Sequence, residues 1–144
     1  MKLLMTIVRW LLVPIVAFSA WFPGIALGLW VRHLFIGICP QDQITSGRCY
    51  ASWFPLAERF SLCLGAAMVA FLAVTQASLM APARKKVAAW STFVAGSLCA
   101  FVFALFFDRW FEFWSAILLG LLTALWLPRY LDRKAEQARN LKGI

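Results

Sequence analysis

Four apolar runs, each long enough to cross a lipid bilayer, dominate this sequence of 144 residues. They cover residues 10–31, 60–80, 87–107 and 110–127, and charged side chains lie close to their ends. About 20 residues of α-helix cross a hydrocarbon layer about 30 Å thick. Because no water reaches the backbone inside such a layer, long runs satisfy their amides as helices. The expected fold class is all-α, a four-helix transmembrane bundle forming a single domain.

The composition excludes an ordinary soluble domain of this length. Hydrophobic residues make up 63% of the chain and charged residues 14%, whereas about a quarter of the residues in a soluble domain are charged. A core built from so short a chain could not hide this much apolar surface from water. The net charge of +8 could suggest a nucleic-acid partner. However, the basic residues flank apolar runs instead of forming one patch, so we expect a lipid bilayer as the partner and no nucleic acid.

The charged residues are distributed unequally between the two ends of the predicted helices. One side carries ten basic residues and only Asp132 and Glu136 against them: Lys2, Arg9, Arg84, Lys85, Lys86, Arg129, Arg133, Lys134, Arg139 and Lys142. The other side carries four basic and four acidic residues. Lys and Arg are retained on the cytoplasmic side of membranes. We therefore expect both termini in the cytoplasm of a bacterial-type inner membrane, residues 33–57 outside, and a basic cytoplasmic tail over 129–144.

The first run contains features that modify a simple span. Lys2, the apolar stretch and the small residues Ser19 and Ala20 resemble a signal peptide, but Phe18 occupies the −3 position and the apolar run continues beyond it. A retained span is expected, and cleavage, which would leave three spans, is the alternative. Pro23 predicts a kink, because proline removes a backbone donor and clashes with the preceding turn. Residues 34–38 are apolar but too short to cross, and we expect them in the outer interface.

Cys39 and Cys49 enclose a polar outer loop that carries most of the turn-forming residues of the chain. Thiols facing an oxidising compartment form disulfides, so the sequence predicts a Cys39–Cys49 bridge. Nine residues separate them instead of the two of a redox motif, which favours a structural bridge over a catalytic thiol pair. Cys63 and Cys99 fall inside spans, where cysteine behaves as a small apolar residue. With one histidine in the chain, we expect no metal site and no cofactor.

Charged residues of both signs map to the outer ends of the predicted helices: Arg32, His33, Glu58, Arg59, Asp108, Arg109 and Glu112. Their balanced signs favour interfacial ion pairs and side chains that reach toward water. The alternative is a polar vestibule that binds a ligand. Asp108 and Glu112 would share one helical face if the fourth helix began that early, and could then share a proton or bind a cation.

The interior of the spans is polar only through hydroxyl and amide groups, and carboxylates and histidine are absent at mid-depth. This absence disfavours ion-coupled transport, since such groups mark ion pathways in membranes. Thr75 and Gln76 are the expected interhelical hydrogen-bonding residues. Small residues at four-residue spacing predict close helix packing: Gly24 and Gly28, Ala66 and Ala70, Gly96 and Ala100, and Gly120 and Ala124.

Together these features predict a non-enzymatic, small inner-membrane subunit or scaffold that associates with other membrane proteins or with itself. One alternative is a membrane thiol or quinone redox protein that uses Cys39 and Cys49. The other is a small channel or transporter whose entrance is the outer charged cluster.

Overall fold

The computed structural model of the chain describes residues 2–81 and 85–142, and the protein is 86% helical. Its elements are α1 (Lys2–Ser19), α2 (Trp21–Gly37), the 3₁₀ turn η1 (Gln41–Gln43), β1 (Ile44–Thr45), β2 (Arg48–Cys49), α3 (Phe54–Met80), α4 (Lys85–Phe107) and α5 (Trp110–Lys142). Four stretches are long and apolar enough to cross a membrane: Leu11–Gly37, Phe54–Met80, Lys85–Phe107 and Trp110–Lys134. The prediction of four long apolar helices is therefore confirmed.

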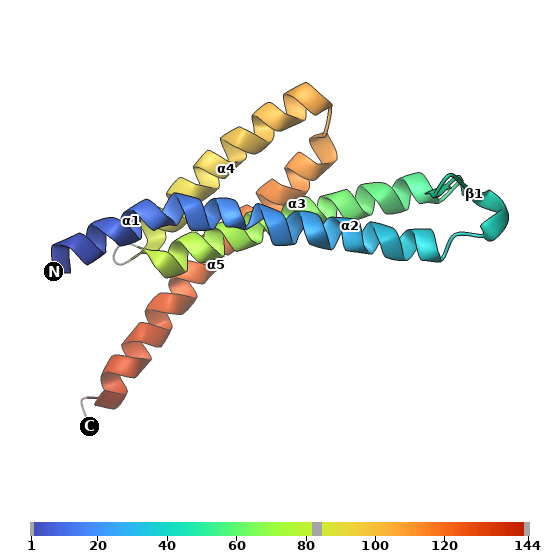
Figure 1. Ribbon diagram of the computed structural model, residues 1–144. Helices are drawn as coiled ribbons and strands as arrows, with labels where there is room; N and C mark the ends of the chain where they lie inside the picture. The colour runs from blue at the N-terminus through green and yellow to red at the C-terminus, as the bar shows by residue number, and fades with distance from the viewer. Residues whose placement is uncertain (1, 82–84, 143–144) are drawn as a thin grey trace.

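Helices α1 and α2 lie end to end and together form the first long stretch (Figure 1). They are separated at Ala20, whose backbone N–H donates to the Ala17 carbonyl three residues back. The irregularity expected from Pro23 thus occurs one turn earlier. Proline disturbs the carbonyl four residues before it, and for Pro23 that carbonyl belongs to Ser19.

The observed helices extend beyond the predicted spans at several ends. Helix α2 continues to Gly37, so residues 34–37 extend a helix instead of lying flat, and α3 begins at Phe54, six residues before the predicted start. Helix α5 continues through Pro128 to Lys142, which makes it about 50 Å long at 1.5 Å per residue. Apolarity located the spans, but backbone hydrogen bonding continues the helices beyond them.

Helix α3 is the central element, because it packs against each of α1, α2, α4 and α5. Helices α2 and α3 form a long antiparallel hairpin that carries the β1–β2 loop at its tip. Helices α4 and α5 form a second hairpin that crosses α3 obliquely, and the last turns of α5 extend away from the other helices (Figure 1). Both chain ends lie at the end of the molecule opposite the tip (Figure 1).

The α2–α3 seam is built from glycine. A Cβ atom added to Gly65 would lie 3.0 Å from the Gly24 carbonyl oxygen and 3.3 Å from the Gly28 Cα, both backbone atoms of α2. A Cβ on Gly24 would overlap the side chain of Val69, and one on Gly28 would lie 3.1 Å from the Ser61 carbonyl oxygen. The two helices therefore touch backbone to backbone, an approach that only small residues permit.

A second contact joins α3, α4 and α5 around buried Val74, Ala89 and Ala124, with Phe93 packed against them. Gly120 belongs to the same region, since a Cβ there would lie 3.1 Å from the Phe93 ring and 3.4 Å from the Ala70 Cβ. Among the remaining small residues singled out from the sequence, Ala66 and Ala100 are half-buried, whereas Gly96 is exposed with no atom within 4 Å of its Cβ position.

Candidate functional site

The tip of the α2–α3 hairpin is a small folded unit closed by the predicted disulfide. Cys39 and Cys49 are bonded, with their Cα atoms 6.1 Å apart. Strands β1 and β2 pair antiparallel, Ile44 with Cys49 and Thr45 with Arg48. The two-residue turn between them has positive φ at Ser46 (51°) and Gly47 (75°). This geometry matches the right-handed twist of a tight hairpin and explains glycine at the second position.

The tip has its own apolar core. Cys39, Cys49, Ala51 and Phe54 are buried there, and Phe35, Ile36 and Ile44 pack against them. Each bridging cysteine is only 6% exposed. Thiol–disulfide exchange needs a thiolate to reach a sulfur atom, and this packing hinders such an approach. The arrangement can therefore fix the loop on the hairpin, and it offers little access for redox chemistry.

The outer charged residues form two separate ion pairs. Arg32 Nε of α2 lies 2.9 Å from Glu58 Oε1 of α3, and Arg109 Nη1 lies 3.1 Å from Glu112 Oε1 within the α4–α5 hairpin. Arg59 connects the two hairpins, with its guanidinium carbon 5.4 Å from the centre of the Phe111 ring. His33 and Asp108 are exposed. The seven predicted residues thus lie at neighbouring helix ends, and the pairs compensate charge locally.

Asp108 and Glu112 do not share a helical face. Helix α5 begins at Trp110, so Asp108 lies before it, in a left-handed conformation with φ of 53°. Glu112 instead receives the hydrogen bond from Arg109. A shared face for Asp108 and Glu112 required the fourth helix to begin before Trp110, and this condition is not met.

Among the described residues, an interhelical hydrogen bond within the apolar region comes from Ser115, whereas the sequence favoured Thr75 and Gln76 for this role. The Ser115 hydroxyl contacts the Cys63 carbonyl oxygen of α3 at 3.1 Å and the Glu112 carbonyl oxygen of its own helix at 2.8 Å. Thr75 Oγ1 and Gln76 Oε1, the expected participants, are buried without a hydrogen-bond partner. The Ser115 acceptor is a backbone carbonyl, so no pairing of residue types in the sequence marks it.

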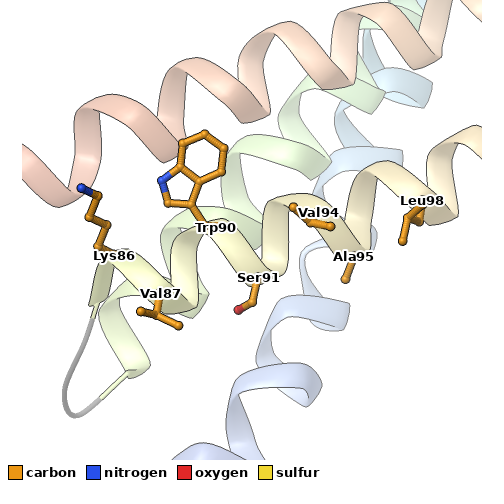
Figure 2. Close-up of a pocket in the computed structure, with 7 residues that line it drawn as sticks. All are labelled: Lys86, Val87, Trp90, Ser91, Val94, Ala95 and Leu98. Atoms are coloured by element: carbon orange, nitrogen blue, oxygen red, sulfur yellow. The ribbon is translucent and has the colours of Figure 1, made fainter.

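A shallow apolar groove, open to its surroundings and lined by residues of α4 alone, runs along this helix. Figure 2 shows Lys86 and Trp90 projecting toward α5, while Val87, Ser91, Ala95 and Leu98 lie on the other side of α4. Within residues 2–81 and 85–142, no group of three or more His, Cys, Asp or Glu side chains is arranged to hold a metal ion. Arg84 of the predicted basic loop, and residues 143–144 of the tail, lie outside the described residues.

Comparison with known proteins gives no relative from which a role could be carried over. No family model matches the chain, and neither a curated protein nor a solved structure matches it.

Proposed function

We propose that the chain is a small, non-enzymatic integral membrane subunit or scaffold that packs beside other membrane proteins or a second copy of itself. The observation that carries this proposal is the large exposed surface of its apolar helices. Only 22%, 22%, 6% and 17% of the most apolar windows of the four long stretches, in chain order, are buried inside the molecule. Apolar surface left in water is costly at about 25 cal/mol per Å², and a bilayer with neighbouring helices removes that cost.

The charge distribution supports an orientation with both termini in the cytoplasm of a bacterial-type inner membrane. The ends of the chain and the start of α4 lie away from the disulfide-closed tip (Figure 1). The basic excess of the sequence belongs to that same end, which fits retention of Lys and Arg on the cytoplasmic side. The tip would then face an oxidising compartment, where its disulfide is stable.

A reporter inserted at residue 45 and one inserted at residue 85 are expected to report opposite sides of the membrane. A phosphatase that is active only outside the cytoplasm should be active at residue 45 and inactive at residue 85. Fluorescent protein fusions at the same two sites provide the complementary signal. Activity of the phosphatase at residue 85 would contradict the proposed orientation.

Helix α4 supports the association part of the proposal. Its apolar window is the least buried of the four, at 6%. Gly96 has no atom within 4 Å of its Cβ position, whereas Gly24, Gly28 and Gly65 are all occupied by intramolecular packing. A small exposed residue on a helix in lipid allows close approach of another helix. Cys99, three residues further along, is exposed and unbonded, so it provides a native cross-linking position near Gly96.

Gly96→Leu is expected to abolish the association while leaving the fold intact. Membranes carrying the wild-type chain at native expression should yield, in mild detergent, a complex larger than the 16.2 kDa monomer. A bifunctional maleimide should cross-link Cys99 within it. The Gly96→Leu protein should elute as a folded monomer, and Val94→Leu, a control at an exposed position of the same helix, should keep the complex. A wild-type chain that elutes alone would overturn the subunit proposal.

The burial of Cys39 and Cys49 in the tip core supports a structural disulfide. The pairing of Arg32 with Glu58 supports a role for these charges as an ion pair that joins α2 to α3. The redox and channel alternatives have no comparable observation in their favour.

A further inference from the structure

The geometry points to a binding site for one anionic phospholipid, with its headgroup between the start of α4 and the Pro128 region of α5 and an acyl chain along α4. A cleft of about 190 Å³ lies between these two helices, and its lining includes Lys86, Trp90, Pro128, Arg129 and Asp132. This inference rests on the proposed membrane insertion, and it does not depend on the partner contact at Gly96.

The charge of the cleft fits an anion. Lys86 and Arg129 contribute two positive charges and Asp132 one negative charge, which leaves a positive excess. The ion pairs among the described residues join Arg32 to Glu58 and Arg109 to Glu112, so none of them involves the cleft. Helix α4 begins at Lys85, and the positive end of its dipole adds to the attraction for a phosphate. Basic pockets between helices at the cytoplasmic surface are suited to anionic headgroups.

The form of the site indicates a lipid in place of a free phosphate. Lys86 and Trp90 line both the cleft and the apolar groove of α4, so the two adjoin at these side chains. The groove extends from Lys86 to Leu98, about 18 Å at the rise of an α-helix. One leaflet of hydrocarbon is about 15 Å thick. A ligand that fills both parts therefore needs a charged head and an apolar chain of about one leaflet.

Trp90 lies at the junction of the two parts. Its ring is half-buried and packs edge-on against Phe93, with the ring centres 5.9 Å apart. In Figure 2 its indole is directed toward α5, beside the Lys86 side chain. Tryptophan favours this depth because its ring is apolar and its N–H donates a hydrogen bond. It would contact the glycerol region of a lipid whose phosphate lies between Lys86 and Arg129.

The test is titration of the purified full-length chain, in a neutral detergent, with dioleoyl phosphatidylglycerol or dioleoyl phosphatidylcholine, followed by native mass spectrometry. The wild-type chain should retain the anionic lipid about tenfold better than the neutral one. Lys86→Gln combined with Arg129→Gln should weaken binding of phosphatidylglycerol roughly 30-fold, from the usual attraction per basic residue. Arg133→Gln combined with Lys134→Gln removes the same charge from residues that do not line the cleft, and should retain most of the binding.

Three outcomes would overturn the inference. Equal retention of the two lipids would show that the charge of the headgroup does not matter. An equal loss of binding in both double variants would show that basic residues attract the lipid regardless of their position. Displacement of phosphatidylglycerol by millimolar glycerol 3-phosphate would assign the cleft to free phosphates, whereas no displacement is expected. A parallel flotation assay with lipid vesicles keeps the proposals apart. A wild-type chain that fails to float contradicts membrane insertion, while one that floats without lipid preference contradicts this inference alone.

Discussion

Replacing Gly65 with leucine is expected to separate α2 from α3 and to lower the free energy of unfolding by about 3 kcal/mol, the upper part of the usual range for overpacking. The space around Gly65 is bounded by the Gly24 carbonyl oxygen and the Gly28 Cα. Because both are backbone atoms, a new side chain cannot be accommodated by rotation of a neighbour. The helices must move apart, and the Arg32–Glu58 pair on the same two helices would lengthen with them.

Gly96→Leu is the matched control for this experiment. It makes the same substitution within a long apolar helix, and it gains the same helix propensity over glycine, but no atom lies within 4 Å of the Gly96 Cβ position. Thermal unfolding of each purified protein as a detergent-solubilised monomer, followed by circular dichroism, should show a lower midpoint for Gly65→Leu only. Equal midpoints for the two variants would show that the glycine seam does not hold the hairpin together.

Gly65 also shows what the sequence could and could not predict. The apolar runs predicted four long helices, because apolarity over about 20 residues is a local property. The packing faces are not local, since they depend on how each helix is rotated against its neighbour. Ala66 and Ala70 were singled out for their spacing, yet Gly65 meets the glycines of α2. Ser61 and Gly65 are also four residues apart, so the small-residue pattern of the actual contact was present in the sequence. Several such patterns overlap along α3, and the sequence does not say which one faces α2.

The helices extend beyond the predicted spans for a related reason. Arg32 suggested the end of the first span, but its charge is matched by Glu58, 26 residues later in the sequence. The α2–α3 hairpin that brings them together is a tertiary feature. The fourth apolar run ends just before Pro128, but a proline removes only one hydrogen bond of a helix, and α5 continues through it. By contrast, the disulfide was predictable, because two cysteines enclosing a short polar loop face few alternative partners.

Removing the disulfide by Cys39→Ser combined with Cys49→Ser is expected to cost about 2–3 kcal/mol, from the chain entropy of a loop of about ten residues. The loss of structure should be confined to the tip, because the α2–α3 seam around Gly65 lies within the two helices, away from the loop. Helical content should therefore stay unchanged while the tip loosens. Arg48, in the exposed part of the loop, should become a faster site of cleavage by trypsin, since local opening precedes proteolysis.

The control is Cys63→Ser combined with Cys99→Ser, which removes the two unbonded cysteines and leaves the loop closed. Its melting temperature should stay above that of the disulfide-free variant, and its tip should resist trypsin as the wild type does. The buried sulfurs should also resist millimolar reduced glutathione in the folded protein and react after unfolding, because exchange needs access to sulfur. A bridge that is reduced readily in the folded chain, with no loss of melting temperature, would instead favour the redox alternative. Burial of Cys39 and Cys49 within the tip core is the reason to expect the opposite.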